Sequence, residues 1–271
     1  MSAPDNSPLL PAEQESGSLS PVPVQVQPPQ PDSLPWTFMD VVRMALLTVV
    51  AIFFFTSISF SIASHRFAPS MSTADAARNP KIILPGQAAA YFLTLGFMVV
   101  LLHQRGRPFW QSVKWRWPSV GVGYLLTGFA LALAVQFSSA YLPIPKSLPI
   151  EQYFTDTSGV WLMAIFGVTL APLMEELFFR GFLYPVLARH LPLWLAIGLT
   201  ALGFALIHAS QLAAAWAPLL LLFGVGLVLT IIRARTGSVA TSFLIHVGYN
   251  ATLFTLLYLS TDHFRHLEKA T

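Results

Sequence analysis

Seven long apolar stretches follow a proline-rich start, and they restrict what this chain can fold into more than any other feature. They run roughly over residues 38–63, 83–103, 118–141, 160–188, 192–209, 215–233 and 238–260. Most are close to the ~20 residues with which a helix crosses a hydrocarbon core. In lipid the backbone must bond within the protein, and long continuous apolar stretches achieve this as helices. The sequence predicts an all-α, polytopic transmembrane helix bundle of about seven helices, with room for an eighth.

Composition supports lipid as the solvent for most of the chain. It is 55% hydrophobic and 10% charged, whereas a soluble domain is about 25% charged. The net charge is +3, and the basic residues stand at the ends of the apolar stretches. This pattern is typical of membrane topology signals and argues against a nucleic-acid partner. The chain has no cysteine, which excludes disulfides, thiolate catalysis and cysteine metal sites.

Three regions follow from this pattern. Residues 1–36 hold 9 of the 21 prolines and no Lys or Arg before Pro35, so we expect a disordered or polyproline-like tail. Residues 37–159 carry the first three predicted membrane helices, and residues 160–260 carry the last four. The short loop after the second stretch is rich in basic residues. Because basic loops stay on the cytoplasmic side, we expect a bacterial plasma-membrane protein with a cytoplasmic N-terminus.

Two adjacent carboxylates lie where a membrane protein avoids charge. Of the 12 Asp and Glu residues, only Glu175 and Glu176 lie well inside an apolar stretch, and Arg180 follows them. A charge at the centre of a spanning helix costs about 2.5–3.5 kcal/mol or more. Glu176 and Arg180 are four residues apart and can pair on one helix face. A purely structural ion pair would explain those two residues. Glu175 points about 100° further round the helix, which makes it the better candidate for a reactive carboxylate.

Two histidines and an asparagine can join these carboxylates. His208 and His246 lie in later apolar stretches, and Asn250 is one helical turn after His246. Each histidine alone is more typical of a hydrogen-bonded packing residue. The turn predicted at residues 190–192 lies midway between Glu175 and His208, so an antiparallel hairpin would bring them to the same depth. The last helix runs parallel to the fifth and can bring His246 there too. The result is a polar cluster inside lipid.

At these residues the sequence resembles a known family. Glu175-Glu176 with Arg180, then Phe204 with His208, then His246 with Asn250, form an E-E-x-x-x-R, F-x-x-x-H and H-x-x-x-N series. This series resembles the CAAX prenyl endopeptidase type II family, whose bacterial members are also called CAAX-protease and bacteriocin-processing (CPBP) proteins. The resemblance covers about residues 160–260. It implies a helical membrane protease with Glu175, His208, His246 and Asn250 as catalytic residues, and a supporting role for Glu176, Arg180 and Phe204.

Two mechanisms stay open for such a site. Glu175 could take a proton from water while His208 orients that water, with His246 and Asn250 as donors to the oxyanion. This glutamate mechanism is favoured and needs no metal or other cofactor. Family members are commonly labelled metalloendopeptidases, and Glu175, His208 and His246 would then be zinc ligands. Against zinc, Asn250 is a better amide donor than ligand, and the H-E-x-x-H pattern is absent.

The predicted function is therefore an intramembrane endopeptidase. Its partners would be the lipid bilayer and a peptide or protein substrate, lipidated or not, in or at the membrane. Two alternatives come from other classes. A non-catalytic membrane partner of the immunity type could keep the fold without using the site. A proton-coupled transporter could use intramembrane Glu and His as a relay, but the paired repeats and broken helices of many transporters are not evident. The sequence leaves the substrate and the oligomeric state open.

Overall fold

Every regular element in the described residues is a helix. The computed structural model describes residues 1, 34–66, 71–154 and 156–267, so most of the predicted tail 1–36 lies outside the described residues. The α-helices are α1 (Phe38–Arg66), α2 (Thr73–Ala76), α3 (Pro80–Gln104), α4 (Phe109–Ser112), α5 (Gly121–Ser139), α6 (Thr157–Val168), α7 (Leu170–Glu176), α8 (Tyr184–His190), α9 (Leu193–Leu206), α10 (Trp216–Thr236) and α11 (Val239–Ser260). Two short 3₁₀ helices, η1 (Pro149–Tyr153) and η3 (Ala209–Leu212), and a π-helical segment, η2 (Leu177–Leu183), complete the list.

Six of the seven predicted stretches form helices long and apolar enough to cross a membrane, counting the described residues only. They are α1, α3, α5, the run α6–α8, α10 and α11. The predicted helical membrane bundle is confirmed, and the chain is an integral membrane protein by these spans. The remaining stretch, the fifth, at 192–209, forms α9 with only 14 residues, or about 21 Å at 1.5 Å per residue. Because α9 ends at Leu206, His208 lies in the turn beyond it rather than inside a helix.

Proline explains why the predicted stretch 160–188 is a broken helix. The ring of a proline clashes with the carbonyl four residues earlier and supplies no N–H to it. For Pro172 that residue is Val168, where α6 ends, and α7 begins at Leu170. For Pro185 it is Gly181, inside the π-helical segment η2. Glu175 and Glu176 are the last two residues of α7, and Arg180 lies in η2. The carboxylates therefore sit between two irregularities of one spanning helix.

The N-terminal end of α6 is capped by an acidic side chain. Asp156 accepts a hydrogen bond from the Gly159 amide at 3.0 Å, which makes it the N-cap residue. The Ser158 hydroxyl donates to the same carboxylate at 2.5 Å, and Lys81 of α3 forms an ion pair with it at 2.9 Å. The Ser158 hydrogen bond, aided by Lys81, holds the pKa of Asp156 below its usual range. This carboxylate links the start of α6 to the start of α3.

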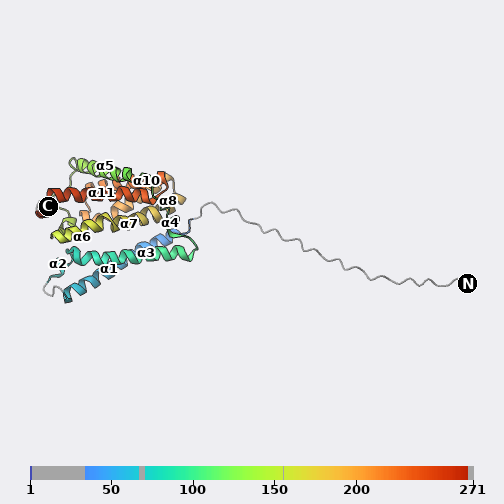
Figure 1. Ribbon diagram of the computed structural model, residues 1–271, viewed down its shortest axis with the longest axis horizontal. Coiled ribbons are helices and arrows are strands. Elements are labelled where there is room, and N and C mark those ends of the chain that lie inside the picture. Colours follow the sequence, from blue (N-terminus) through green and yellow to red (C-terminus); the bar gives the residue numbers. More distant parts are fainter. Residues whose placement is uncertain (2–33, 67–70, 155, 268–271) are drawn as a thin grey trace. The chain divides into compact units, whose positions relative to one another are not determined.

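The helices pack so that α11 is central to the site. In Figure 1, α3 lies between α1 and the α6–α7 segment, and α11 lies between α5 and α7. Helix α10 packs against both α9 and α11. Together α7, α9, α10 and α11 enclose the residues that the sequence analysis singled out.

Helices α5 and α11 meet through glycines. A Cβ added at Gly128 would lie 2.1 Å from the Ile245 carbonyl oxygen, and one added at Gly248 would lie 2.3 Å from the Leu125 carbonyl oxygen. Lipid does not push helices together as water does, so small residues that allow close backbone approach are the usual contact. These two glycines set the distance at which α11, with His246, packs on α5.

Gly128→Val is therefore expected to lower the thermal stability of the purified protein. The added side chain meets backbone atoms that cannot rotate away, so we expect a loss of about 1–3 kcal/mol or more. The matched control is Gly96→Val, because a Cβ at Gly96 meets nothing within 4 Å. Thermal unfolding in detergent measures both. Equal unfolding temperatures for the two variants would contradict the close contact.

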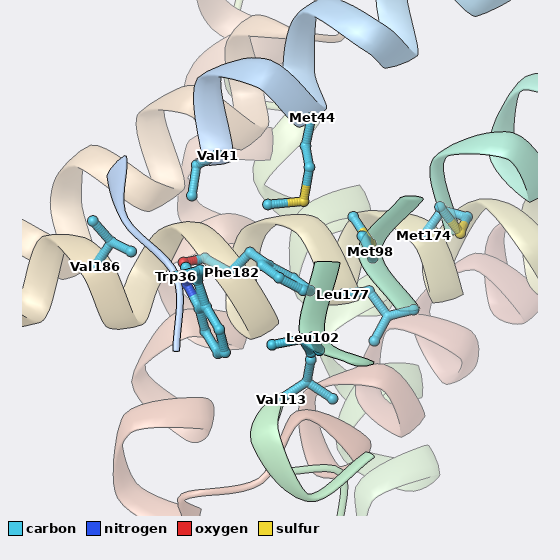
Figure 2. Close-up of a cluster of buried hydrophobic side chains, with 10 residues drawn as sticks. All are labelled: Trp36, Val41, Met44, Met98, Leu102, Val113, Met174, Leu177, Phe182 and Val186. Atoms are coloured by element: carbon cyan, nitrogen blue, oxygen red, sulfur yellow. The ribbon is translucent and has the colours of Figure 1, made fainter. Parts of the chain in front are cut away.

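A buried apolar cluster joins the first helices to η2. Its members are Trp36, Val41, Met44, Met98, Leu102, Val113, Met174, Leu177, Phe182 and Val186 (Figure 2). Trp36 is 2% exposed; its indole N–H donates to the Phe182 carbonyl at 3.0 Å, and the two rings lie 4.6 Å apart. Asp40 of α1 forms an ion pair with Arg105, just after α3, at 2.9 Å. Trp36, just before α1, is thus attached to the helical segment that carries Arg180.

Candidate active site

The two adjacent glutamates have different surroundings, as their positions on the helix predict. The Glu176 side chain is 0% exposed, whereas the Glu175 side chain is 14% exposed. Glu176 is bonded to its neighbours through one oxygen, Oε1. Glu175 has a looser contact, with its Oε2 lying 3.7 Å from Nε2 of His246, which is longer than a hydrogen bond. Glu175 is therefore the carboxylate that is left available for chemistry.

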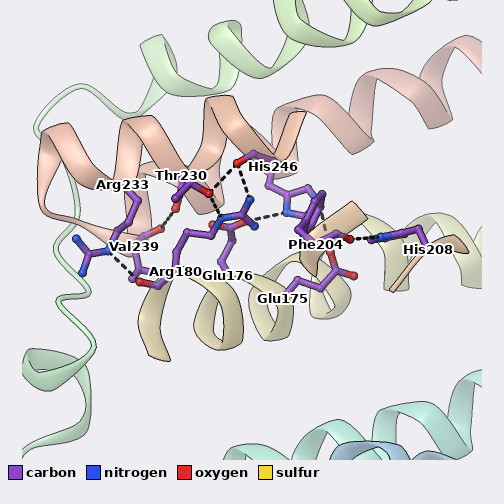
Figure 3. Close-up of polar contacts among 11 residues, drawn as sticks. Glu175, Glu176, Arg180, Phe204, His208, Thr230, Arg233, Val239 and His246 are labelled. Carbon is purple, nitrogen blue, oxygen red and sulfur yellow. Dashed lines mark hydrogen bonds and ion pairs between the residues drawn. The ribbon is translucent and has the colours of Figure 1, made fainter. Parts of the chain in front are cut away.

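Glu176 and Arg180 form the predicted pair on one helix face. The Arg180 Nη1 donates to Glu176 Oε1 at 2.9 Å, and both side chains are fully buried. The guanidinium has further partners on α10: Nε donates to the Thr230 hydroxyl at 3.3 Å, and Nη2 donates to the Gly226 carbonyl at 3.1 Å. Figure 3 shows these contacts side by side. Burying a charge pair is costly unless further hydrogen bonds satisfy its remaining groups, and α10 supplies acceptors for two more of the five N–H donors of Arg180.

His246 connects the two carboxylates. Its Nδ1 lies 3.1 Å from Glu176 Oε1, and its Nε2 faces Glu175. Because a carboxylate oxygen can only accept, Nδ1 carries the hydrogen of this bond. In the neutral ring Nε2 then has a lone pair directed toward Glu175, and it becomes a donor when the ring takes a second proton. The ring is only 3% exposed, so its orientation is set by the protein.

His208 has the same tautomer for a similar reason. Its Nδ1 lies 2.9 Å from the Phe204 carbonyl oxygen, and a carbonyl can only accept, so Nδ1 is the donor. The Nε2 of the neutral ring is then an acceptor. His208 lies just after α9 and before η3, where the helix has ended and its last carbonyls need donors. His208 thus caps the end of α9 through Nδ1, and its Nε2 can bond to another group.

Phe204 is the apolar centre of the cluster. Its ring centroid lies 5.1 Å from that of His208 and 5.6 Å from that of His246. The Arg180 guanidinium lies over the same ring at 4.6 Å, a favourable cation–π distance. One phenyl ring therefore contacts both histidines and the arginine. The predicted supporting role of Phe204 would therefore be to pack against these three side chains.

Asn250 lies one turn after His246 on α11, as predicted, but its amide is already in use. The Nδ2 group donates to the Gly167 carbonyl at 2.6 Å, near the end of α6. An amide nitrogen carries two hydrogens, so one donor remains. Asn250 thereby ties α11 to α6 close to the break before α7.

The alternative zinc site does not match this arrangement. The ligands for such a site would be Glu175, His208 and His246. Within the part of the chain that the structure describes, no group of three or more His, Asp or Glu residues is placed so that it could hold a metal ion. The side chains as they stand do not fit a three-ligand zinc site.

Several residues around the cluster were not singled out from the sequence. Thr230 and Gly226 look like ordinary residues of an apolar stretch, and a Thr there commonly bonds to its own helix. Thr230 does so as well, to Gly226 at 2.7 Å. Arg233 is one of the basic residues at the end of an apolar stretch, but it lies inside α10 and is 5% exposed, and its Nε donates to the Arg180 carbonyl at 3.2 Å. Only the charge of Arg233 in an otherwise apolar run could have signalled this contact.

Fold and site together define a polytopic membrane protein with an acid–base cluster inside its helix bundle. Residues 157–252 match the family described as type II CAAX prenyl endopeptidase, Rce1-like. The chain is also 30% identical over 140 residues to UPF0177 protein YbdI of Lactococcus lactis subsp. lactis (strain IL1403), a match that covers 52% of this chain and 74% of that protein. No solved structure matches the chain. The chain belongs to the Rce1-like type II CAAX prenyl endopeptidase family, a family of intramembrane proteases, and the predicted resemblance is confirmed.

Proposed function

We propose that this protein is an intramembrane endopeptidase that uses Glu175 as its general base. The observation that carries the proposal is the contrast between the two glutamates. Glu176 is bonded to Arg180 and His246, while Glu175 is partly exposed and its Oε2 lies 3.7 Å from Nε2 of His246. A structural ion network would need only the bonded glutamate, Glu176. A partly exposed carboxylate such as Glu175, close to a histidine, is suited to proton transfer.

A water molecule between Glu175 and His246 would be the nucleophile. Atoms 3.7 Å apart are too far for a direct hydrogen bond, but one water can bond to both at ordinary lengths. Glu175 Oε2 would take a proton from this water as its oxygen attacks the peptide carbonyl. A water has two hydrogens, so while Glu175 accepts one, either His246 or the Nε2 of His208 accepts the other, and His208 would orient the water in this way or share the acid–base work. Each of these groups is held by the protein before substrate arrives.

The oxyanion that then forms needs donors. His246 would supply one when its Nε2 carries a proton passed on from Glu175, and the resulting imidazolium would stay bonded to Glu176. When the tetrahedral intermediate collapses, the C–N bond breaks and His246 gives this proton to the leaving amine nitrogen. The remaining N–H of Asn250 would supply another. Glu176 and Arg180 take no part in proton transfer in this scheme. They hold His246 in one orientation and balance one of the two buried negative charges.

The substrate class follows from where the cluster lies. The site is enclosed by spanning helices, so the peptide must reach it from within or beside the bilayer. Membrane-associated peptides and proteins, lipidated or not, are the substrates we propose. A cytoplasmic N-terminus is proposed because the short α3–α5 loop carries Arg105, Arg107, Lys114 and Arg116. The modest length of the chain favours a bacterial protein, in the plasma membrane.

The test is cleavage of a library of membrane-tethered peptides by the purified protein in lipid nanodiscs. We expect the wild type to cut, and to cut equally well after treatment with a strong chelator, because the proposed mechanism uses no metal. Mass spectrometry of the products gives the cleavage positions. Loss of cleavage on chelation, with recovery on adding zinc, would replace the glutamate mechanism. A folded protein that cuts nothing in a broad library would favour the non-catalytic partner or the transporter.

A further inference from the structure

The π-helical segment η2 leaves one backbone carbonyl without its usual donor. In an α-helix the Arg180 carbonyl would accept from the amide of Tyr184, four residues on. Here the Tyr184 amide donates instead to Phe179, five residues back. A continued π-helix would use residue 185, but Pro185 has no N–H. A buried carbonyl seldom stays without a partner, so another element has to supply the donor.

Arg233 supplies that donor from α10. Its Nε lies 3.2 Å from the Arg180 carbonyl oxygen in a buried contact. The side chain is 5% exposed, and its guanidinium lies 5.8 Å from the centre of the Tyr184 ring. Figure 3 shows both arginines: Arg233 bonds to the backbone of Arg180, and the side chain of Arg180 bonds to Thr230 and Glu176. A guanidinium Nε is held in the plane of the group, so this bond has a defined direction.

Charge pairing does not account for the burial of Arg233. The ion pairs formed by the described residues do not include it. Arg235, two residues further on, is exposed in the way expected for a basic residue at a membrane surface. The feature that separates the two arginines is the hydrogen bond from Arg233 to η2.

We propose that Arg233 is a positioning residue for the active site, acting through Arg180. Its bond holds the backbone of Arg180, and the side chain of that same residue holds Glu176. Glu176 in turn holds His246 against Glu175. This inference rests on the proposed function for its effect on catalysis. The structural part of it, that the Nε donor holds η2, stands separately.

A second contact of the same kind supports this reading. The indole N–H of Trp36 donates to the Phe182 carbonyl, two residues after Arg180, at 3.0 Å in a buried contact. Side chains from two elements far apart in the sequence thus bond to backbone carbonyls of η2. The irregular segment is held by its neighbours on both sides.

Three substitutions at position 233 separate the donor from the charge. In glutamine, as in arginine, the atom after Cδ is a nitrogen that carries hydrogen, so Arg233→Gln keeps a donor and removes the charge. Lysine has a carbon at that position, so Arg233→Lys keeps the charge but removes the donor at the Nε position, leaving N–H groups only one atom further along the side chain. Arg233→Met removes both. We expect Arg233→Lys and Arg233→Met to lower kcat by about tenfold to a hundredfold with KM little changed, as for a small misplacement of catalytic groups. Arg233→Gln should stay within a few-fold of wild type on the same grounds.

Hydrogen–deuterium exchange over residues 177–190 gives a second readout that needs no activity. Exchange there should quicken in Arg233→Lys and Arg233→Met but not in Arg233→Gln, with Arg235→Met as the matched control in both assays. If Arg233→Lys resembles wild type while Arg233→Gln does not, charge matters and the proposal is wrong. Equal behaviour of all three variants and wild type would overturn it too. Should the wild type cut no peptide, the proposed function fails, and the exchange pattern alone decides whether Arg233 holds η2.

Discussion

Replacing Glu175 by glutamine is expected to abolish peptide cleavage while leaving the fold intact. Glutamine keeps the size of the side chain but cannot accept a proton at neutral pH, and removal of a general base typically costs about 10²–10⁴-fold in rate. The Glu175 contact with His246, at 3.7 Å, is longer than a hydrogen bond, so little folding energy depends on it. We expect kcat to fall by that factor and the unfolding temperature in detergent to stay near that of wild type.

The control is the same carboxylate-to-amide change on another helix. Asp75 lies on α2, away from the cluster, and is exposed, so Asp75→Asn should keep full activity. Single-turnover cleavage of one identified peptide compares the three proteins. A Glu175→Gln enzyme as fast as wild type would exclude Glu175 as the base and leave His208 and His246 as the candidates.

Replacing Arg180 by methionine is expected to destabilise the fold itself, unlike the change at Glu175, which should affect activity alone. Arg180 and Glu176 are both fully buried. Removing one partner leaves a buried charge without compensation, which typically costs about 3–5 kcal/mol. A loss of this size is a large share of the stability of a marginally stable protein. We expect low yield of folded protein and a strongly lowered unfolding temperature.

A second substitution tests whether the uncompensated charge is the cause. The double variant Glu176→Gln with Arg180→Met buries neither charge, so it should be more stable than Arg180→Met alone. Such non-additivity is expected for residues in direct contact. Arg235→Met, which removes an exposed arginine, is the control and should unfold like wild type. A double variant less stable than Arg180→Met would mean that Glu176 is not the group left unpaired.

Much of this protein follows from local rules that need no tertiary information. Apolar stretches near 20 residues predict the spanning helices because the bilayer has a fixed thickness. Asp156 predicts the start of α6 because it can cap a helix. The pair Glu176–Arg180 follows from a spacing of four residues on one helix. The position of Glu175, one step round the same helix, predicts its separation from that pair. Each of these depends on residues close together in the chain.

The remaining features depend on which helices pack together. Phe204 contacts His208, His246 and Arg180 at once only because η2, α9 and α11 pack together. The tautomers of the two histidines depend on a Phe204 carbonyl freed by the end of α9 and on a glutamate from another helix. The sequence suggested that these residues could gather, but not which ring nitrogen would face which partner.

Arg233 shows most clearly why the partners of buried polar groups could not be predicted from the sequence. By sequence it looks like its neighbour Arg235, a basic residue at the end of an apolar stretch, and both are consistent with a membrane surface. Its burial depends on a carbonyl of η2 that lacks a main-chain donor, 53 residues earlier in the chain. The presence of the spanning helices, the cap of α6 and the i, i+4 pair are set by short-range geometry and by the bilayer, so the sequence alone determined them. The partners of buried polar groups are set by long-range packing, so only the tertiary structure decided them.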